Sequence, residues 1–277
     1  MFLDSLDLDR PHIMGIINVT PDSFSDGGQL FALGAPNLDR VYAVVEKMQQ
    51  SGATFVDVGG QTTKPGFERI TPQEEIDRVV PVIQGIKERF DLCISVDTST
   101  PDVMAASIES GAGLVNDVEA LADEAALTIC AEKQVPVVLM HSFRGEEGIH
   151  SKGPLAHLIQ DELNFFHARI KRCINAGIES SNIIIDPGFG FGKSLDEYKI
   201  LLNQLSRFSI LACPILVGLS RKKTISTLLG GRELNQRMAG GLGLSVLAYQ
   251  QGARIFRTHD VAETYDALMA YSKIQAS

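Results

Sequence analysis

The segment SGATFVDV (51–58) places a glycine directly before a short run of apolar residues. The same order recurs in SGAGLVND (110–117), AGIESSNIIID (176–186) and QGARIFR (251–257). A glycine at such a point favours a helix that ends in a left-handed conformation, and the β-branched residues behind it favour a strand. The four segments therefore predict the helix-to-strand junctions of βαβ units.

Short apolar runs of this kind occur eight times along the chain. We predict strands at residues 12–18, 54–58, 93–97, 113–117, 136–141, 182–186, 214–218 and 253–257. The runs do not alternate with polar residues, which is typical of parallel strands covered on both faces. Apolar residues at helical spacing fill the segments between them, as in 38–48 and 76–86. Eight strand–helix units predict an α/β fold, a (β/α)₈ TIM barrel in one domain over residues 1–277, with a doubly wound open sheet as the alternative.

Two of the predicted connections are longer than a strand-to-helix turn requires. Residues 19–37 after the first strand and 59–73 after the second are rich in Gly, Ser, Thr, Pro and Gln. Barrel enzymes carry active-site loops at this end of their strands. We therefore expect long loops after strands 1 and 2 to border the active site.

Composition and charge limit the possible partners. Hydrophobic residues make up 44% of the chain and charged residues 21%, which is typical of a globular protein. The net charge of -9 and the pI near 5.2 argue against nucleic acid or an anionic membrane as a partner. The acidic start MFLDSLDLDRPH (1–12), with no long apolar run elsewhere, indicates a cytoplasmic protein. Scattered cysteines predict buried thiols rather than disulfides or zinc ligands. They are Cys93, Cys130, Cys173 and Cys213.

Polar or ionisable residues stand at or just past the end of every predicted strand. In chain order they are Asn18, Asp57, Asp97, Asn116, His141, Asp186, the Ser220-Arg221-Lys222 run, and Arg257 with His259. Any one of them could instead cap the following helix. If the barrel closes, however, all of them lie on the face where barrel enzymes carry their active sites. The pattern therefore predicts an active site made from the carboxyl ends of the strands.

These strand-end residues divide into two chemical groups. Asp97, Asn116 and Asp186 can present carboxylate and amide edges to a flat, nitrogen-rich heterocycle such as an amino-pyrimidinone. Arg257 with His259, and the Ser220-Arg221-Lys222 run, place positive groups directly at strand ends and suit a phosphate group. The sequence therefore predicts a ligand with a heterocyclic half and an anionic half.

Longer motifs around these residues resemble those of dihydropteroate synthases. They are MGIINVTPDSFSDGG (14–28), DVGGQTTKPG (57–66), ISVDTS (94–99), VND (115–117), VVLMH (137–141), IIIDPGFGFGK (183–193), LVGLSRK (216–222) and RTHD (257–260). The motifs follow the order of that family over nearly the whole chain. The resemblance implies a (β/α)₈ enzyme that condenses 6-hydroxymethyl-7,8-dihydropterin diphosphate with p-aminobenzoate. The products are 7,8-dihydropteroate and diphosphate, the pathway is folate biosynthesis, and the cofactor is Mg²⁺.

The resemblance also implies roles for individual residues. The pterin would be held by Asp97, Asn116, Asp186 and Lys222. The diphosphate would be held by Asn18, Thr63, Arg257 and His259, and Asn18 would also bind Mg²⁺. The p-aminobenzoate would contact Phe24, Thr63, Lys64, Pro65, Phe191 and Ser220. Family members are commonly homodimers and bind sulfonamides that mimic p-aminobenzoate. They first ionise the pterin C–O bond, and the amine then attacks the resulting methylene cation.

Three departures from the family pattern fall outside the pterin residues. GGQTTKPG (59–66) stands where GGESTRPG is usual, Glu119 stands where Arg is often found, and Ser142-Phe143-Arg144 stands where Met-Gln-Gly is common. Two alternatives therefore stay open: a catalytically silent paralogue that only binds pterin, and a pterin-dependent methyltransferase. The methyltransferase would have no use for the NVTPDSF loop together with the S-R-K and R-T-H motifs. The departures at 61–64 make the silent paralogue the stronger alternative.

The departures in the second loop predict an altered interaction with p-aminobenzoate. Lys64 offers a single-point donor on a flexible stem where Arg offers a planar fork, so loop closure is less tightly specified. Reverting the segment (Gln61→Glu, Thr62→Ser, Lys64→Arg) should change the KM for p-aminobenzoate and leave the KM for the pterin diphosphate unchanged. Steady-state kinetics on both substrates measure this. An unchanged KM for p-aminobenzoate in the revertant would mean that the departures are neutral.

Overall fold

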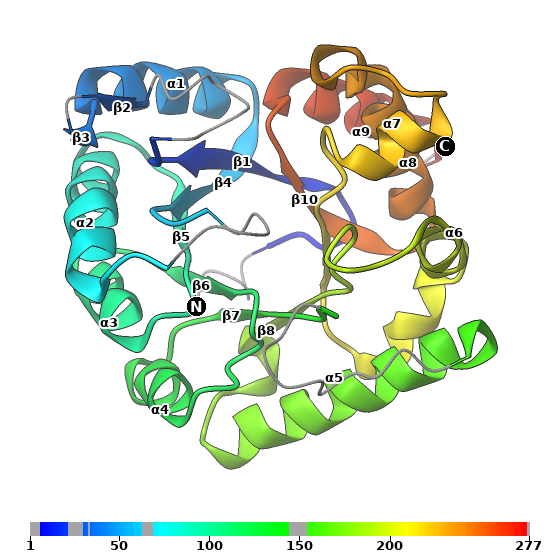
Figure 1. Ribbon diagram of the computed structural model, residues 1–277, viewed down its shortest axis with the longest axis horizontal. Helices are drawn as coiled ribbons and strands as arrows, with labels where there is room; N and C mark the ends of the chain where they lie inside the picture. Colours follow the sequence, from blue (N-terminus) through cyan, green and yellow to red (C-terminus); the bar gives the residue numbers. More distant parts are fainter. Residues whose placement is uncertain (1–5, 22–29, 33, 63–68, 144–153, 276–277) are drawn as a thin grey trace.

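The computed structural model describes residues 6–21, 30–32, 34–62, 69–143 and 154–275. Its centre is a closed barrel of eight parallel strands (Figure 1). In chain order these are β1 (His12–Asn18), β4 (Ala53–Gly59), β5 (Cys93–Asp97), β6 (Leu114–Asp117), β7 (Val137–Met140), β8 (Ile183–Asp186), β9 (Ile215–Val217) and β10 (Ala253–Thr258). Each strand pairs with the next barrel strand along the chain, and β10 pairs with β1 to close the ring. The predicted TIM barrel is confirmed, and every predicted strand ends within one residue of its observed bounds.

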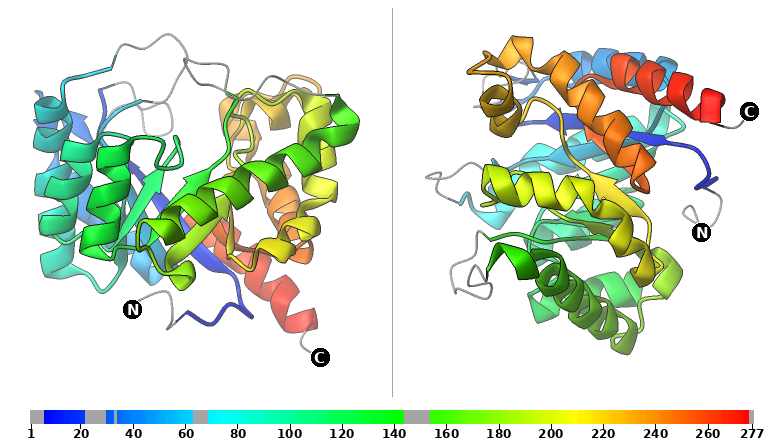
Figure 2. Two further views of the ribbon diagram at one scale, coloured as in Figure 1. Left: turned by 90° about the horizontal axis from the view of Figure 1, so that it is seen from below. Right: turned by 90° about the vertical axis from the view of Figure 1, so that its right-hand side faces the viewer.

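Helices surround the barrel on its outside in all three views (Figures 1 and 2). The α-helices of the described residues are α1 (Leu38–Gln50), α2 (Pro72–Arg89), α3 (Pro101–Glu109), α4 (Glu124–Lys133), α5 (Leu158–Asn175), α6 (Leu195–Asn203), α7 (Lys223–Leu228), α8 (Met238–Gln250) and α9 (Val261–Gln275). Short 3₁₀ helices accompany them as η2 (Leu155–His157), η3 (Ser180–Asn182), η4 (Leu205–Leu211) and η5 (Leu234–Gln236). An antiparallel hairpin of β2 (Phe31–Ala32) and β3 (Ala35–Pro36) lies within the expected long loop after β1. The sequence does not predict it, because two-residue strands leave no periodic signal.

The helix-to-strand junctions have the geometry that the sequence predicts. The junction glycines all have positive φ: Gly52 (88°), Gly111 (115°), Gly177 (102°) and Gly252 (102°). At Gly52 the requirement is also steric, because a Cβ atom would lie 2.5 Å from the ring of Tyr265 on α9. Only glycine combines this backbone conformation with such close packing. Each junction thus directs the chain from the outer helix layer back into the barrel.

The barrel interior is filled, toward the amino ends of the strands, by one side chain from each strand. These side chains form a separate buried cluster, the barrel plug: Met14, Phe55, Cys93, Leu114, Val138, Ile184, Leu216 and Ile255. A larger buried cluster fills the space between the strands and the helices. Full burial of a large apolar side chain stabilises a fold by about 1.5–3 kcal/mol. The plug closes the barrel beneath the carboxyl ends of the strands, which are left for polar residues.

The expected buried thiols are confirmed at Cys93, Cys130 and Cys173, whereas Cys213 is only partly buried, and all four are free. Burial raises the pKa of the Cys93 and Cys130 thiols to about 12, so both stay protonated at neutral pH. Among the described residues, no helix is both long enough and apolar enough to cross a membrane.

Candidate active site

Alternation along the strands places polar residues directly above the barrel plug. Successive side chains of a strand point to opposite faces, so a residue two or four positions after a plug residue again points into the barrel. On the eight strands these positions hold Asn18, Asp57, Asp97, Asn116, Met140, Asp186, Gly218 and Arg257. The strand register alone therefore brings most of the predicted strand-end residues to one end of the barrel.

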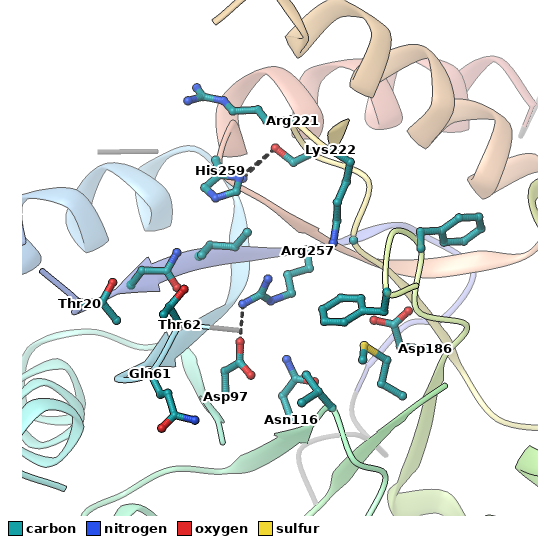
Figure 3. A pocket seen from close by; sticks show the side chains of 18 of the residues that line it. Thr20, Gln61, Thr62, Asp97, Asn116, Asp186, Arg221, Lys222, Arg257 and His259 are labelled. Atoms are coloured by element: carbon teal, nitrogen blue, oxygen red, sulfur yellow. Dashed lines mark hydrogen bonds and ion pairs between the residues drawn. The ribbon is translucent and has the colours of Figure 1, made fainter. Parts of the chain in front are cut away.

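A cavity of about 290 Å³ opens at this end (Figure 3). It is lined by every predicted site residue that the structure describes: Asn18, Asp97, Asn116, Asp186, Phe191, Ser220, Lys222, Arg257 and His259. Four further predicted site residues, Phe24, Thr63, Lys64 and Pro65, lie outside the described residues. The volume is at the small end of the range for small-molecule sites. The structure thus brings both predicted chemical groups into one cavity.

The guanidinium of Arg257 connects two carboxylates at the base of the cavity. Its Nε donates to Oδ2 of Asp57 (2.6 Å), and its Nη2 donates to Oδ2 of Asp97 (2.7 Å). Asp57 is fully buried, and its Oδ2 also accepts a hydrogen bond from Nδ2 of Asn116 (3.1 Å). Figure 3 shows Arg257 reaching across the cavity toward Asp97. This network therefore ties β10 to β4, β5 and β6.

Burial and charge oppose each other in the network. Burial lowers the pKa of Arg257, but attraction to Asp57 and Asp97 outweighs it, and the net direction is upward. Burial raises the pKa of Asp97, and Arg257 opposes this shift. Because two carboxylates share one guanidinium, the network has acceptor capacity that a ligand with N–H donors can use. This is the property expected of a pocket for an amino-pyrimidinone edge.

Asp186 places a further carboxylate in the cavity. Its Oδ1 accepts a hydrogen bond from the backbone N–H of Gly188 (2.7 Å). Burial raises the pKa of Asp186, whereas the Gly188 N–H, Lys222 and Lys193 lower it. The Lys222 Nζ also lies 4.6 Å from the centroid of the Phe191 ring, a cation–π contact. Figure 3 shows Lys222 pointing into the cavity above Asp186, so that donor and acceptor groups face the same space.

The other side of the cavity carries His259, Ser220 and Arg221. Oγ of Ser220 lies 3.2 Å from Nδ1 of His259 and donates to Oδ2 of Asp260 (3.3 Å). Asp260 also accepts hydrogen bonds from Nε (3.1 Å) and Nη2 (2.5 Å) of Arg221. Burial, together with the charges of Arg257 and Arg221, lowers the pKa of His259 to about 3. His259 is therefore neutral at pH 7, and the neighbouring cations make this side suitable for an anion.

Asn18, at the end of β1, supplies an oxygen suited to a hard metal ion. A Cβ atom built on Gly59 would lie 3.5 Å from Oδ1 of Asn18 and 3.8 Å from Oδ2 of Asp97, so both oxygens border the same space. Mg²⁺ prefers such oxygens and commonly uses one or two protein ligands together with substrate phosphates. These residues therefore fit Mg²⁺. The part of the chain that the structure describes has no group of three or more His, Cys, Asp or Glu that could hold a metal ion. A phosphate ligand would complete the site.

Two strand-end residues do not line the cavity. Asp57 lies beneath it and supports Arg257 from below. His141 follows Met140, which points into the barrel, so alternation turns His141 outward. It packs there against the Phe165 ring, with ring centroids 4.9 Å apart. The expectation that every strand-end residue borders the site is therefore wrong for both residues: Asp57 points into the barrel but is covered by Arg257, and His141 stands on the opposite face of its strand.

Other residues line the cavity without being singled out by the sequence pattern. They include Ile16, Thr20, Val118, Met140, Phe189 and Leu234. Alternation alone would identify Ile16 and Met140, because both stand two positions after a plug residue. Leu234 belongs to η5, between α7 and α8, and no strand-end signal points to it.

Comparison with known proteins identifies the family of the chain. The family described as pterin binding enzyme matches residues 14–259. Dihydropteroate synthase of Escherichia coli is 44% identical over 265 residues, which cover 95% of this chain and 92% of that protein. The structure of Xanthomonas albilineans dihydropteroate synthase in complex with 7,8-dihydropteroate aligns with a TM-score of 0.85 and 41% identity, covering 98% of this chain and 96% of the other. Yersinia pestis dihydropteroate synthase in complex with a sulfonamide drug aligns with a TM-score of 0.89 and 41% identity, covering 98% and 97%.

The closed barrel and its polar cavity, with the family match over residues 14–259, define the class as pterin-binding enzymes. Identity above 40% over nearly the full length of both chains then decides the family within that class. The chain belongs to the dihydropteroate synthase family.

Asp57 should contribute to stability through Arg257. We expect Asp57→Asn to lower the free energy of unfolding by about 1–3 kcal/mol, the usual cost of disrupting a buried charged hydrogen bond. Glu124→Gln is the matched control, because it removes an exposed carboxylate that pairs with Arg172, and it should have a much smaller effect. Denaturant unfolding of both variants measures the difference. Equally small effects would show that the barrel does not depend on this contact.

Proposed function

We propose that the chain catalyses the reaction of its family. In this reaction 6-hydroxymethyl-7,8-dihydropterin diphosphate and p-aminobenzoate condense to 7,8-dihydropteroate and diphosphate, a transferase step of folate biosynthesis. The observation that carries the proposal is a single cavity with a carboxylate and amide side for the ring and a cationic side for the diphosphate. The Xanthomonas albilineans relative, which aligns over nearly the whole chain, holds 7,8-dihydropteroate, the product of this reaction.

The pterin ring is assigned to the side of the cavity that carries Asp97, Asn116, Asp186 and Lys222. A carboxylate accepts paired N–H donors from an amino-pyrimidinone edge, and the Gly188 N–H holds the Asp186 carboxylate in place for this. The Asn116 amide is held through its nitrogen, which leaves the amide oxygen as an acceptor. Lys222 supplies a donor to acceptor atoms of the same ring. Donors and acceptors are therefore fixed before the ring arrives.

The diphosphate is assigned to Arg257 and His259, with Asn18 at the end of β1. A bound polyanion favours the protonated form of histidine, so the pKa of His259 should rise when the diphosphate binds. Protonated His259 then donates from Nδ1 to Oγ of Ser220 and has the N–H of Nε2 as a donor for the anion. Thr63 is also proposed to bind the diphosphate. This part of the proposal rests on the family resemblance alone, because Thr63 lies outside the described residues.

We also propose Mg²⁺ as the cofactor, held by Asn18 together with oxygens of the diphosphate. The support is the space above Gly59, which the Oδ1 of Asn18 and the Oδ2 of Asp97 both border. When bound, the ion would neutralise part of the charge on the leaving group.

The chemical step requires no covalent bond to the enzyme. The C–O bond between the pterin methylene and the diphosphate breaks, and its electron pair leaves with the diphosphate, which Arg257 and His259 stabilise. The positive charge spreads from the methylene into the ring, where the carboxylates of Asp97 and Asp186 stabilise it. The amine of p-aminobenzoate then forms the C–N bond and loses a proton. The cavity acts mainly by position and electrostatics.

The p-aminobenzoate is assigned to the neighbourhood of Phe191 and Ser220, which line the cavity. Phe24, Lys64 and Pro65 complete this part of the proposal, and they lie outside the described residues. Sulfonamides mimic p-aminobenzoate, and the Yersinia pestis relative was solved with a sulfonamide drug. We extend sulfonamide binding to this chain on that basis.

A homodimer and a cytoplasmic location are further parts of the proposal. The dimer follows the habit of the family, and the location is supported by the acidic sequence and by cysteines that are free, as suits a reducing compartment. The relatives described above are all dihydropteroate synthases, which gives the methyltransferase alternative no support. The silent paralogue differs from the proposal in turnover, and a turnover assay separates them.

Binding of the diphosphate should depend on His259 more than binding of the ring does. His259→Ala should raise the KM for the pterin diphosphate by about tenfold or more, the effect of losing a charge-assisted hydrogen bond. The affinity for 6-hydroxymethyl-7,8-dihydropterin, which lacks the diphosphate, should barely change. Asp186→Asn is the matched control, because it should weaken both ligands together. His259 is a cleaner target than Arg257, since Arg257 also holds two carboxylates in place.

Steady-state kinetics with Mg²⁺ and calorimetric titration measure these two effects. The wild-type protein should release one diphosphate for each dihydropteroate formed. The reaction should stop when the metal is chelated. Pterin binding without turnover would favour the silent paralogue. Equal losses for both ligands in His259→Ala would assign that residue a structural role.

A further inference from the structure

Lys193, between β8 and α6, places an ammonium group in the protein interior. Its side chain is 0% exposed, and it does not line the cavity. Glu162 of α5 and His141 after β7 lie beside it and are 1% and 3% exposed. Removing such charges from water costs roughly as much free energy as their mutual attraction returns, so a buried ion pair is weak support for stability. The proposed reaction does not use this cluster, so its presence calls for another role.

The ammonium is surrounded by groups from three separate segments. Nζ donates to the carbonyl oxygens of His141 and Gly188, each at 3.2 Å. It also lies 3.1 Å from Nδ1 of His141 and 3.6 Å from Oε1 of Glu162. The Phe143 ring covers the ammonium, with its centroid 5.1 Å from Nζ. Lys193 therefore bridges the end of β7, the turn after β8, and α5.

The bridged carbonyls belong to segments that form the pterin side of the cavity. The backbone N–H of His141 donates to the carbonyl oxygen of Asp186 (2.9 Å). The backbone N–H of Phe143 donates to the carbonyl oxygen of Phe191 (3.2 Å). A Cβ atom on Gly188, whose φ is +68°, would lie 1.9 Å from the His141 carbonyl oxygen, so the two backbones approach as closely as glycine allows. The buried ammonium thus holds a tight turn. The turn begins at Asp186, which is proposed to bind the pterin, and ends near Phe191, an aromatic residue that lines the cavity.

The same ammonium acts on the charge of Asp186. Burial lowers the pKa of Lys193, whereas Glu162 and Asp186 raise it. Burial raises the pKa of Asp186, and Lys193 is among the groups that lower it. The positive charge of Lys193 therefore favours the ionised form of the Asp186 carboxylate. The hydrogen bonds of the same ammonium fix the backbone next to Asp186.

We propose that Lys193 is a positioning residue: its buried ammonium fixes the turn from Asp186 to Phe191 and so orients the carboxylate that binds the pterin ring. This inference rests on the proposed role of Asp186 in pterin binding. Glu162 balances the charge of Lys193, whereas the two backbone carbonyls accept the hydrogen bonds that set the turn. Mutation can separate these two contributions.

The double variant Lys193→Met/Glu162→Gln removes both charges and nearly keeps the side-chain volumes. Because neither charge of the pair is left behind, the melting temperature should stay close to that of the wild type. The affinity for 6-hydroxymethyl-7,8-dihydropterin should fall by about tenfold or more, as expected when a charge-assisted hydrogen bond is misaligned. The affinity for inorganic diphosphate with Mg²⁺ should not change, since Arg257 and His259 stand at the end of β10.

Two single variants serve as controls in the same calorimetric titrations. Glu162→Gln keeps the ammonium and its two backbone hydrogen bonds, so it should retain pterin affinity, but it should lower the melting temperature because the ammonium loses its counter-charge. Lys199→Met removes an exposed lysine that pairs with Asp196 on α6, and it should match the wild type in every measurement.

Three outcomes would overturn the inference. The first is wild-type pterin affinity in the double variant, which would mean that the turn keeps its shape without the ammonium. The second is an equal loss for pterin and diphosphate with a lowered melting temperature, which would indicate general structural damage. The third is a wild-type protein that binds no pterin, and this result alone would also overturn the proposed function.

Discussion

The ion pairs of Arg257 with Asp57 and Asp97 constrain the carboxyl end of the barrel. A guanidinium is planar, so the two carboxylates that it binds are fixed relative to each other. Asp57 in turn accepts a hydrogen bond from Asn116 and so fixes the position of its amide. In a chain with a net charge of -9, this partly buried cation also allows several carboxylates to share one cavity. The same side chain lies between the ring side of the cavity and the side of His259. Under the proposed function, the substrate bond that breaks would lie at the boundary between these two sides.

Much of the fold can be predicted from the sequence because the signals are local. A glycine such as Gly52 marks the end of a helix by its own conformation, and a β-branched run marks the strand that follows. The site follows from alternation, which sends Asp97 and Asn116 into the barrel and His141 away from it. Applying alternation to each strand from the sequence would have separated His141 from the residues that line the cavity. The family motifs supplied the chemical roles, which the positions alone do not specify.

The remaining features depend on contacts between segments far apart in the chain. Lys193 is visible in the DPGFGFGK motif, but its burial depends on the carbonyl of His141 and on Glu162 of α5. Asp260 is likewise visible in RTHD, but its partner Arg221 belongs to the loop after β9. Leu234 lines the cavity from η5, which lies between α7 and α8 rather than at the end of a strand. None of these contacts leaves a periodic signal, so the sequence predicts the lining of the site better than the groups that support it.

A crystal structure of the protein with Mg²⁺, 6-hydroxymethyl-7,8-dihydropterin and diphosphate tests the division of the cavity most directly. We expect ring N–H groups within hydrogen-bond distance of Asp186 and Asn116. We expect the diphosphate to contact Arg257 and His259 while Arg257 keeps its hydrogen bond to Asp57. A pterin ring bound outside this cavity, or a diphosphate bound beside Asp186 in place of the ring, would contradict the assignment of the two sides.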